Sequence, residues 1–296
     1  MRPSRIFLRL FLEIKRVFDN RPFIAEFDIT DKCNLRCGHC YHFAKMKDQE
    51  STEVPLEVWK ERFDRLHAEG IRMVMLMGGE PLLRKDIVKL ACEMFPFVEM
   101  ITNGTIELPE NHDHRIFVSL DGMRETNDGM RGQGVFDKVL KNVSKDSRVV
   151  FNMTLNGHNY KELEQVVELS VRSGTAGVVC NLFTTVSPDQ ETISRELRKN
   201  MTDEIRRVKK MYPGNLLFTV PAIDWFEKGD HRDRCYWREK VVHYSTGWQK
   251  RPCFAFADCS NCGCFSGAMA SPFYSFSHFI ATVKLVIETS FFKKRG

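Results

Sequence analysis

Six short apolar segments recur along the first two thirds of this chain, and most of the stretches between them carry a helical pattern. Such alternation of strand and helix is typical of a parallel sheet with right-handed crossovers. In such a sheet the loops at the carboxyl ends of the strands hold most functional residues. We therefore expect an α/β fold. The strand-like segments are 23–30, 74–77, 98–102, 116–120, 149–155 and 177–183, and the helical ones are 55–69, 84–95, 134–143, 160–172 and 192–211.

The alternation of strand and helix begins near residue 23 and ends near residue 213, so we expect three regions in the chain. Residues 1–22 are expected to form an amphipathic N-terminal helix, and residues 23–213 the α/β core. Residues 214–296 are aromatic, rich in cysteine and irregular in pattern, and they close with a second amphipathic segment. We therefore expect a small C-terminal extension beside a larger core domain.

Composition excludes several classes of protein. With 43% hydrophobic residues and 23 phenylalanines among 296, the chain is not expected to be disordered. It has no run of about 18 uncharged apolar residues, so no membrane-spanning helix is expected. Arg9, Glu13 and Lys15 interrupt the apolar run at the N-terminus, which argues against a secretory signal. A net charge of +5 is mild for this length and indicates no nucleic-acid partner.

Ten cysteines are present, and most of them fall into two tight clusters. In the first, directly after the first expected strand, Cys33, Cys37 and Cys40 have the spacing C-x3-C-x2-C. Soft thiolates select iron–sulfur clusters, zinc or copper(I). A structural zinc site needs a fourth ligand, which His39 or His42 would have to supply. A 4Fe–4S cluster held by three thiolates would instead leave one iron open for another ligand.

A second motif follows the second expected strand and consists of Gly78, Gly79, Glu80 and Pro81. Two glycines at a strand end allow the backbone to approach a ligand closely. The carboxylate can accept hydrogen bonds from an ammonium group. The alternative interpretation is an ordinary Gly-Gly turn before a helix that begins with proline.

The segments CNLRCGHCY, MGGEPLL and VSLDG, the last followed by Arg131-Gly132, occur in this order along the chain. In this combination the chain resembles the radical S-adenosylmethionine (radical SAM) enzymes over residues 23–185. Within that family it resembles the branch with a cysteine-rich C-terminal extension of the SPASM or twitch type. The resemblance implies a partial (βα)6 barrel, similar to a TIM barrel, over residues 23–213.

The resemblance also implies roles for individual residues. Cys33, Cys37 and Cys40 would ligate three irons of a 4Fe–4S cluster, while the amine and carboxylate of SAM chelate the fourth. The Gly-Gly-Glu-Pro motif would bind the SAM amino group. Ser119 and Asp121 would face the SAM ribose or carboxylate, Arg131 would pair with the carboxylate, and Asn152 would lie near the nucleoside. Turns, solvated loop charges and structural hydrogen bonds are the alternative roles for these last four residues.

The second cysteine cluster comprises Cys253, Cys259, Cys262 and Cys264, with Cys235 upstream. Four thiolates can close a zinc site or a complete 4Fe–4S site. The spacing C-x5-C-x2-C-x-C is not that of a standard zinc finger. We favour one auxiliary iron–sulfur cluster, with structural zinc and a metal-free loop as alternatives. The two remaining cysteines, Cys92 and Cys180, are most simply buried apolar side chains.

Both ends of the chain have a cationic face opposite an apolar one, at 1–18 and 272–292. This pattern is typical of helices that lie on a membrane surface. The alternative is that both segments pack against the core with their charges in solvent. We expect a cytoplasmic protein with possible peripheral contact to the inner face of the membrane.

By its resemblance the chain is expected to be an enzyme that cleaves SAM reductively and forms a 5′-deoxyadenosyl radical. That radical would abstract hydrogen from a substrate, either a membrane lipid or isoprenoid or a peptide, and an electron donor such as flavodoxin or ferredoxin would act as partner. The alternative is a non-catalytic iron–sulfur or zinc protein that carries electrons or senses redox state. No residue that acts on the substrate is identifiable from the sequence.

Overall fold

The computed structural model describes most of the 296 residues. The described residues are 22, 24–45, 53–110, 114–184, 192–232, 235–251, 253, 259–270 and 280–281. Both amphipathic ends expected from the sequence, 1–18 and 272–292, lie outside them apart from residues 280 and 281.

One sheet organises the described part of the chain. Its eight strands lie in the order β6-β5-β4-β3-β2-β1-β7-β8. All neighbours pair in parallel except β7 and β8, which are antiparallel. The bounds are β1 (Ile24–Asp28), β2 (Met73–Met77), β3 (Phe97–Thr102), β4 (Ile116–Ser119), β5 (Val149–Leu155), β6 (Gly177–Leu182), β7 (Val241–Tyr244) and β8 (Lys250–Arg251). The six strands expected from the sequence are β1 to β6, and the expected α/β class is confirmed.

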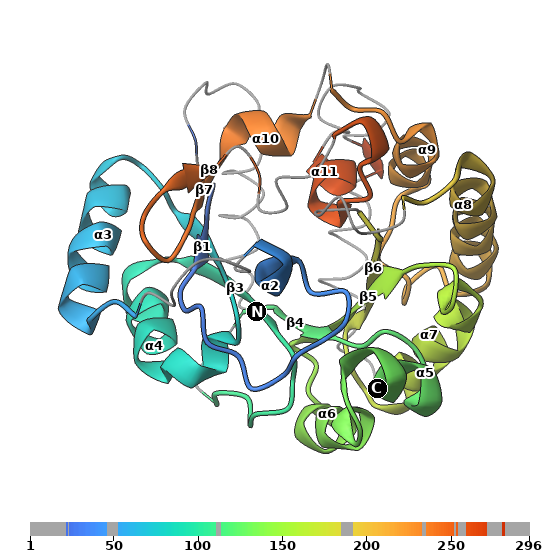
Figure 1. Cartoon of the computed structure of the whole chain (residues 1–296), viewed down its shortest axis with the longest axis horizontal. Helices are drawn as coiled ribbons and strands as arrows, with labels where there is room; N and C mark the ends of the chain where they lie inside the picture. The colour runs from blue at the N-terminus through green and yellow to red at the C-terminus, as the bar shows by residue number, and fades with distance from the viewer. Residues whose placement is uncertain are drawn as a thin grey trace.

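Helices connect the parallel strands and lie round the outside of the sheet, as α3, α4, α6, α7 and α8 do in Figure 1. The longer ones are α3 (Leu56–Ala68), α4 (Lys85–Met94), α5 (Arg124–Arg131), α6 (Val135–Val143), α7 (Leu163–Arg172), α8 (Arg195–Met211) and α9 (Val220–Lys228). The short ones are α2 (Tyr41–Lys45), α10 (Tyr236–Lys240) and α11 (Phe265–Ala270), with 3-10 turns η1 (Pro81–Arg84), η2 (Tyr160–Glu162) and η3 (Cys259–Asn261). This arrangement confirms the expected partial barrel.

Helix starts follow the local sequence. Ser194 precedes α8, and its side chain accepts a hydrogen bond from the backbone N–H of Leu197 at 3.1 Å. Thr219 caps α9 in the same way, and a proline occupies the first turn of that helix. Such caps satisfy backbone donors that have no partner within the helix.

Side chains alternate between the two faces of each strand, and one face packs against the outer helices. Phe27 of β1 is fully buried against Trp59 and Phe63 of α3, with ring centroids 5.9 and 5.7 Å apart. The neighbouring positions of β1, Glu26 and Asp28, therefore point to the opposite face, which we call the inner face.

Strand β7 belongs to the region expected to form a separate extension, but it pairs directly with β1. The core and the extension therefore share one sheet. The boundary near residue 213 stays a prediction.

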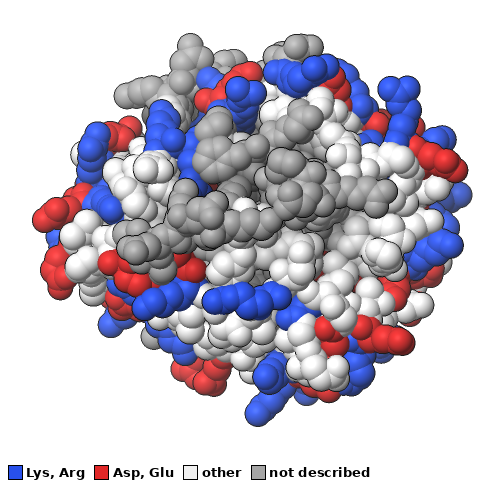
Figure 2. Space-filling model, in the orientation of Figure 1, with Lys and Arg blue, Asp and Glu red and all other residues white. Residues whose placement is uncertain are grey.

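Charged side chains of both signs are interspersed over the outer helices α3, α4, α7 and α8 in Figure 2. On α8, Arg207 pairs with Glu164 of α7 at 2.7 Å and with Glu204 at 2.6 Å. These solvated pairs agree with the mild net charge. No helix in the described part of the chain is long and apolar enough to cross a membrane.

Candidate functional site

The first cysteine motif forms a loop between β1 and α2, at the carboxyl edge of the sheet. Cys33, Cys37 and Cys40 are each half-buried. Burial raises the pKa of the Cys33 and Cys37 thiols, and the neighbouring cysteines raise it further because their negative charges would repel one another. Within the loop the N–H of Cys40 donates to the carbonyl of Cys37 at 3.2 Å, so the chain turns back on itself between these two cysteines.

Several N–H groups point at two of these sulfurs. The backbone N–H of Leu35 donates to Sγ of Cys33 at 3.4 Å, and the side-chain amide of Asn103 lies 3.8 Å from the same sulfur. A guanidinium N–H of Arg131 lies 4.0 Å from Sγ of Cys37. Such donors stabilise negatively charged sulfur, and cysteine thiolates with N–H donors around them are the usual ligands of iron–sulfur clusters. The loop therefore fits a thiolate-held cluster.

Within the described residues, no group of three or more His, Cys, Asp or Glu side chains is arranged to hold a single metal ion.

The two glycines of the second motif approach the cysteine loop itself. Gly78 has a φ of +123°, and an added Cβ there would lie 2.5 Å from the carbonyl oxygen of Thr30. At Gly79 an added Cβ would lie 2.1 Å from the carbonyl oxygen of Lys32. The backbone N–H groups of Gly79 and Glu80 donate to these same two carbonyls at 2.8 Å. The glycines thus permit close approach to backbone, whereas the sequence suggested close approach to a ligand.

Glu80 is fully buried and joins the ends of β2 and β3. Its carboxylate accepts hydrogen bonds from the hydroxyl of Thr102 at 2.7 Å, the N–H of Asn103 at 2.8 Å and the N–H of Leu82 at 2.9 Å. Burial raises the pKa of Glu80, and these three donors oppose the increase. Pro81 begins η1 directly after it. The predicted role of this motif toward the SAM amino group stays a prediction.

The end of β3 also holds the cysteine loop. The amide of Asn103 donates to Oδ1 of Asn34 at 2.8 Å, and the amide of Asn34 donates to the hydroxyl of Thr105 at 2.8 Å. The Thr-Asn-Gly-Thr segment at the end of β3 therefore contacts the cysteine loop directly.

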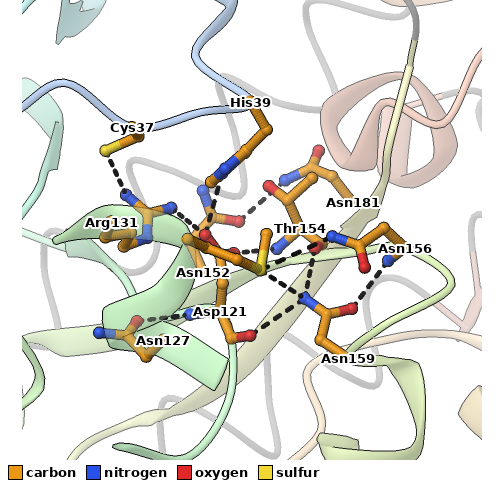
Figure 3. Close-up of polar contacts among 11 residues, drawn as sticks. Cys37, His39, Asp121, Asn127, Arg131, Asn152, Thr154, Asn156, Asn159 and Asn181 are labelled. Atoms are coloured by element: carbon orange, nitrogen blue, oxygen red, sulfur yellow. Dashed lines mark hydrogen bonds and ion pairs between the residues drawn. The ribbon is translucent and has the colours of Figure 1, made fainter. Parts of the chain in front are cut away.

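Asp121 lies at the centre of the polar network in Figure 3. Its carboxylate is fully buried, pairs with Arg131 at 2.6 Å and with Nε2 of His39 at 3.0 Å, and accepts the N–H of Thr154 at 2.7 Å. Burial alone would raise the pKa of Asp121, but Arg131 and His39 outweigh it and lower the pKa to about 2. The structure therefore brings Asp121 and Arg131 together beside the cysteine loop, while Nε of Arg131 has no hydrogen-bond partner among the described residues.

The two other predicted cofactor residues lie on adjacent strands. Ser119 of β4 is opposite Asn152 of β5 in the parallel register. The amide of Asn181 on β6 donates to Oδ1 of Asn152 at 2.9 Å. Ser119 and Asn152 thus lie near Asp121 at the same edge of the sheet, and their contact with a nucleoside stays a prediction.

Sequence reasoning missed a set of ionisable residues on the inner face. Glu26 forms an ion pair with His243 of β7, and both side chains are almost fully buried. Two residues further along β1, on the same face, Asp28 pairs with Arg251 of β8 at 2.5 Å. Tyr41 follows Cys40 directly in the chain. Burial raises the pKa of Tyr41, and the charges of Asp28 and Cys40 raise it further. The ionisable residues of the inner face therefore lie beside the cysteine loop. Glu26 and Asp28 alternate within an otherwise apolar strand, which was the available signal.

Five cysteines meet in the C-terminal region, one more than the four of the predicted set. Burial raises the pKa of Cys262 to about 12 and also raises that of Cys235 and Cys264. Cys253 raises the pKa of Cys264 further, and Cys259 raises the pKa of Cys235 and of Cys262 further, because like charges would repel. Gly267 shows that Cys235 lies beside this cluster, because the N–H of Gly267 donates to Sγ of Cys264 at 3.4 Å and a Cβ added to Gly267 would lie 3.6 Å from Sγ of Cys235. From the sequence, Cys235 was placed upstream of the four predicted cysteines.

Three comparisons with known proteins agree with these motifs. Residues 27–170 match the model of the family described as Radical SAM superfamily. The Fe-coproporphyrin III synthase of Methanosarcina barkeri (strain Fusaro / DSM 804) is 34% identical over 167 residues, which cover 51% of this chain and 41% of that protein. The sporulation killing factor maturation protein SkfB of Bacillus subtilis (strain 168) is 30% identical over 168 residues, which cover 52% of this chain and 40% of that protein. The chain thus spans less than half the length of these two curated relatives.

The crystal structure of Streptococcus suis SuiB bound to S-adenosylmethionine has a TM-score of 0.64 and 14% identity to this chain, covering 83% of this chain and 63% of that one. This likeness supports the fold. The family brings with it a 4Fe–4S cluster and SAM as cofactors and a need for a reductant, as the resemblance implied. From its ordered motifs, its sheet and the matched residues, the part of the chain that holds this site, residues 27–170, belongs to the Radical SAM superfamily.

Proposed function

We propose that this protein cleaves SAM reductively and uses the resulting 5′-deoxyadenosyl radical to abstract a hydrogen atom from its substrate. The observation that carries the proposal is the loop of Cys33, Cys37 and Cys40, with N–H donors directed at two of its sulfurs, within residues that match the family.

Cys33, Cys37 and Cys40 would hold the 4Fe–4S cluster, and the bound cluster and SAM supply the radical. The chain's own residues position the loop: the backbone of Gly79 and Glu80 and the amide of Asn103 bond to it. Below the loop, on the inner face, the side chains of β2 are methionines that are only 5% exposed. These apolar side chains would keep water away from a radical formed beside them.

The proposal predicts an oxygen-sensitive protein that releases 5′-deoxyadenosine when it is reconstituted with iron and sulfide, reduced with dithionite and mixed with SAM. Replacing Cys33, Cys37 and Cys40 by alanine should abolish this product, whereas Cys92→Ala should retain it. Retention of cleavage by the triple variant would refute the proposal. A wild-type chain that loads a cluster but neither binds nor cleaves SAM would instead favour a non-catalytic electron carrier.

For the substrate we propose a peptide. The named functions of SkfB, and of the subtilosin biosynthesis protein AlbA of Bacillus subtilis (strain 168) at 31% identity, concern the maturation of peptide products. The ionisable side chains Glu26, Asp28, His243 and Arg251 give the inner face groups that hydrogen-bond a polar substrate better than an aliphatic chain.

The substrate proposal is tested by the rate of 5′-deoxyadenosine release with added compounds. The panel is a set of short synthetic peptides, coproporphyrin, GTP and phospholipid vesicles, with no addition as the baseline. Stimulation by a peptide, with a product of altered mass, supports the proposal. Stimulation by coproporphyrin, GTP or lipid alone would replace the peptide by that class.

As electron donor we propose flavodoxin or ferredoxin. Either protein, kept reduced by its own reductase and NADPH, should replace dithionite in the cleavage assay. Cleavage with dithionite but with neither protein would contradict this choice of donor.

For the five C-terminal cysteines we propose one auxiliary iron–sulfur cluster. Arg198 of α8 holds their loop, because its buried guanidinium donates to the carbonyls of Phe226, Asn261 and Cys262 at 2.7 to 3.0 Å. The wild-type chain should bind about twice the four irons of a single 4Fe–4S cluster. Replacing Cys262 and Cys264 by alanine should remove the second set while SAM cleavage persists. Zinc in place of this iron would contradict the cluster.

We also propose peripheral contact with the cytoplasmic membrane surface through 1–18 and 272–292. The full chain should sediment with vesicles that contain anionic phospholipid, and a chain that lacks 1–18 and 270–296 should stay in solution. Equal sedimentation of both chains would contradict this contact.

A further inference from the structure

Both the backbone and the side chain of Asp121 form hydrogen bonds with other parts of the protein. Its backbone N–H donates to the side chain of Asn127 at 3.0 Å, and its carbonyl accepts the amide of Asn159 at 3.0 Å (Figure 3). One carboxylate oxygen accepts the backbone N–H of Thr154 on β5 at 2.7 Å. Asp121 is therefore held through its backbone by Asn127 and Asn159, and through its side chain by β5.

The other carboxylate oxygen reaches the cysteine loop by two routes. It pairs directly with Nε2 of His39, which lies between Cys37 and Cys40, at 3.0 Å. It also pairs with Nη2 of Arg131 at 2.6 Å, and Nη1 of the same guanidinium lies 4.0 Å from Sγ of Cys37. One buried carboxylate thus holds the loop on both sides of Gly38.

The planar guanidinium of Arg131 suits its place between the carboxylate of Asp121 and the sulfur of Cys37. A planar guanidinium presents several N–H groups in fixed directions, so one arginine can contact a carboxylate and a sulfur together, which a lysine ammonium does less well. Arg131 ends α5 and is 9% exposed. A further bond, from the N–H of Gly38 to the carbonyl of Met130 at 3.2 Å, joins the loop to the same helix end.

We propose that Asp121, acting through Arg131 and His39, positions the first cysteine loop, and that Arg131 raises the reduction potential of the cluster through Cys37. This inference rests on the proposed function, since it requires that Cys37 ligate a cluster. Asp121 and His39 are positioning residues: their side chains bond to each other, to Arg131 and to the sheet.

The physical basis for the effect is electrostatic. Reduction adds one negative charge to the cluster, and an N–H donor or a cation beside a ligand sulfur stabilises the more negative state. Removing that donor should therefore make reduction harder. A change of tenfold in the ratio of reduced to oxidised cluster at a fixed potential corresponds to about 59 mV for a one-electron couple.

The test is a redox titration of the reconstituted full-length chain, followed by the electron paramagnetic resonance signal of the reduced cluster. The signal that changes on addition of SAM identifies the cluster at Cys33, Cys37 and Cys40. In Arg131→Lys the cation and the pair with Asp121 are retained while the second N–H is lost. We expect its midpoint to be more negative, so that at the wild-type midpoint the reduced-to-oxidised ratio falls several-fold with unchanged iron content.

Arg124→Lys is the matched control, because Arg124 lies on the same helix and pairs with Asp137, but it is exposed and does not contact the cysteine loop. Its midpoint should equal that of the wild type. His39→Gln tests the other route: glutamine keeps a donor toward Asp121, and it should retain both cluster and potential better than His39→Ala.

An unchanged midpoint in Arg131→Lys with a full cluster would overturn the inference while leaving SAM cleavage as proposed. Failure of the wild-type chain to load any cluster would instead refute the proposed function. If Arg131→Lys does not fold, as judged by circular dichroism, the comparison of His39→Gln with His39→Ala decides: equal iron content and equal midpoints in these two variants would overturn the positioning role.

Discussion

At the scale of single residues, the sequence motifs named residues that the structure brings to one edge of the sheet, but they did not predict which groups these residues contact. Glycine at 78 and 79 was interpreted as leaving room for a ligand, and the structure uses that room for the backbone of Thr30 and Lys32. A motif indicates that a small residue is needed at a position, whereas only the folded structure shows which part of the chain approaches that residue. The pairing of Asp121 with His39 was hidden because these residues lie more than 80 positions apart in sequence, and the motif that holds Asp121 and Arg131 did not predict that they pair with each other.

Gly79→Ala should destabilise the chain. The added Cβ would lie 2.1 Å from the carbonyl oxygen of Lys32, so the cysteine loop has to shift. Overpacking of this kind costs about 1–3 kcal/mol in the free energy of unfolding. Urea unfolding followed by circular dichroism measures it. In the control Gly129→Ala, on α5, nothing lies within 4 Å of the new Cβ, and stability should be equal or higher. Equal stability of Gly79→Ala and wild type would contradict the close approach.

At the scale of elements, periodicity was sufficient for β1 to β6 because each is a mostly apolar segment with most of its residues buried. It failed for α5, whose sequence Arg-Glu-Thr-Asn-Asp-Gly-Met-Arg has no apolar stripe. That helix is held by polar contacts instead: the carboxylate of Asp128 accepts the N–H groups of Gly134 and Phe136, both at 2.8 Å. Strand β7 was missed because four residues after an irregular segment carry too little pattern, and its partner β1 lies more than 200 residues earlier.

The pairing of β7 with β1 predicts a strong coupling between Glu26 and His243. Both are almost fully buried, so His243→Leu leaves a carboxylate without its partner and should cost about 3–5 kcal/mol in the free energy of unfolding. The double variant with Glu26→Met should recover most of this loss, because two apolar side chains need no partner. A double-mutant cycle from urea unfolding measures the coupling. Additive losses in the double variant would contradict it.

The docking of the C-terminal cysteine loop on α8 predicts a local effect of Arg198→Met. This change removes the donors to Phe226, Asn261 and Cys262, and each buried carbonyl left without a partner costs about 1–3 kcal/mol. Hydrogen exchange should become faster at the N–H of Cys262, which bonds to Gly229. Arg207→Met on the same helix is the control, since its pairs are partly exposed and should change exchange little. Equal exchange rates at the N–H of Cys262 in both variants would show that Arg198 does not hold the C-terminal cysteine loop.

At the scale of the whole molecule, the order of motifs along the chain was enough to predict which loops share one edge of the sheet. Parallel strands bring their carboxyl ends together, so the segments after β1, β2 and β4 had to meet. Their spacing could not predict the polar inner face, which needs β1, β7 and β8 in register. Local pattern therefore predicted which loops would form the proposed cofactor site, and long-range pairing brought together the ionisable residues that we propose for the substrate.

The same connectivity predicts that loading the cluster stabilises the whole sheet. The cysteine loop is bonded to the ends of β2 and β3 and to α5, so ordering the loop also stabilises these elements. A ligand that binds only the folded chain adds about 2.7 kcal/mol at 100 times its dissociation constant. Each kcal/mol raises the melting temperature by about 2–4 °C in domains of 150–250 residues. Calorimetry under anaerobic conditions should therefore show one transition that moves up by several degrees on reconstitution and returns after iron is removed with a chelator. The chain with Cys33, Cys37 and Cys40 replaced by alanine should lose this shift, and an equal shift in that variant would mean that the stabilising iron is bound elsewhere.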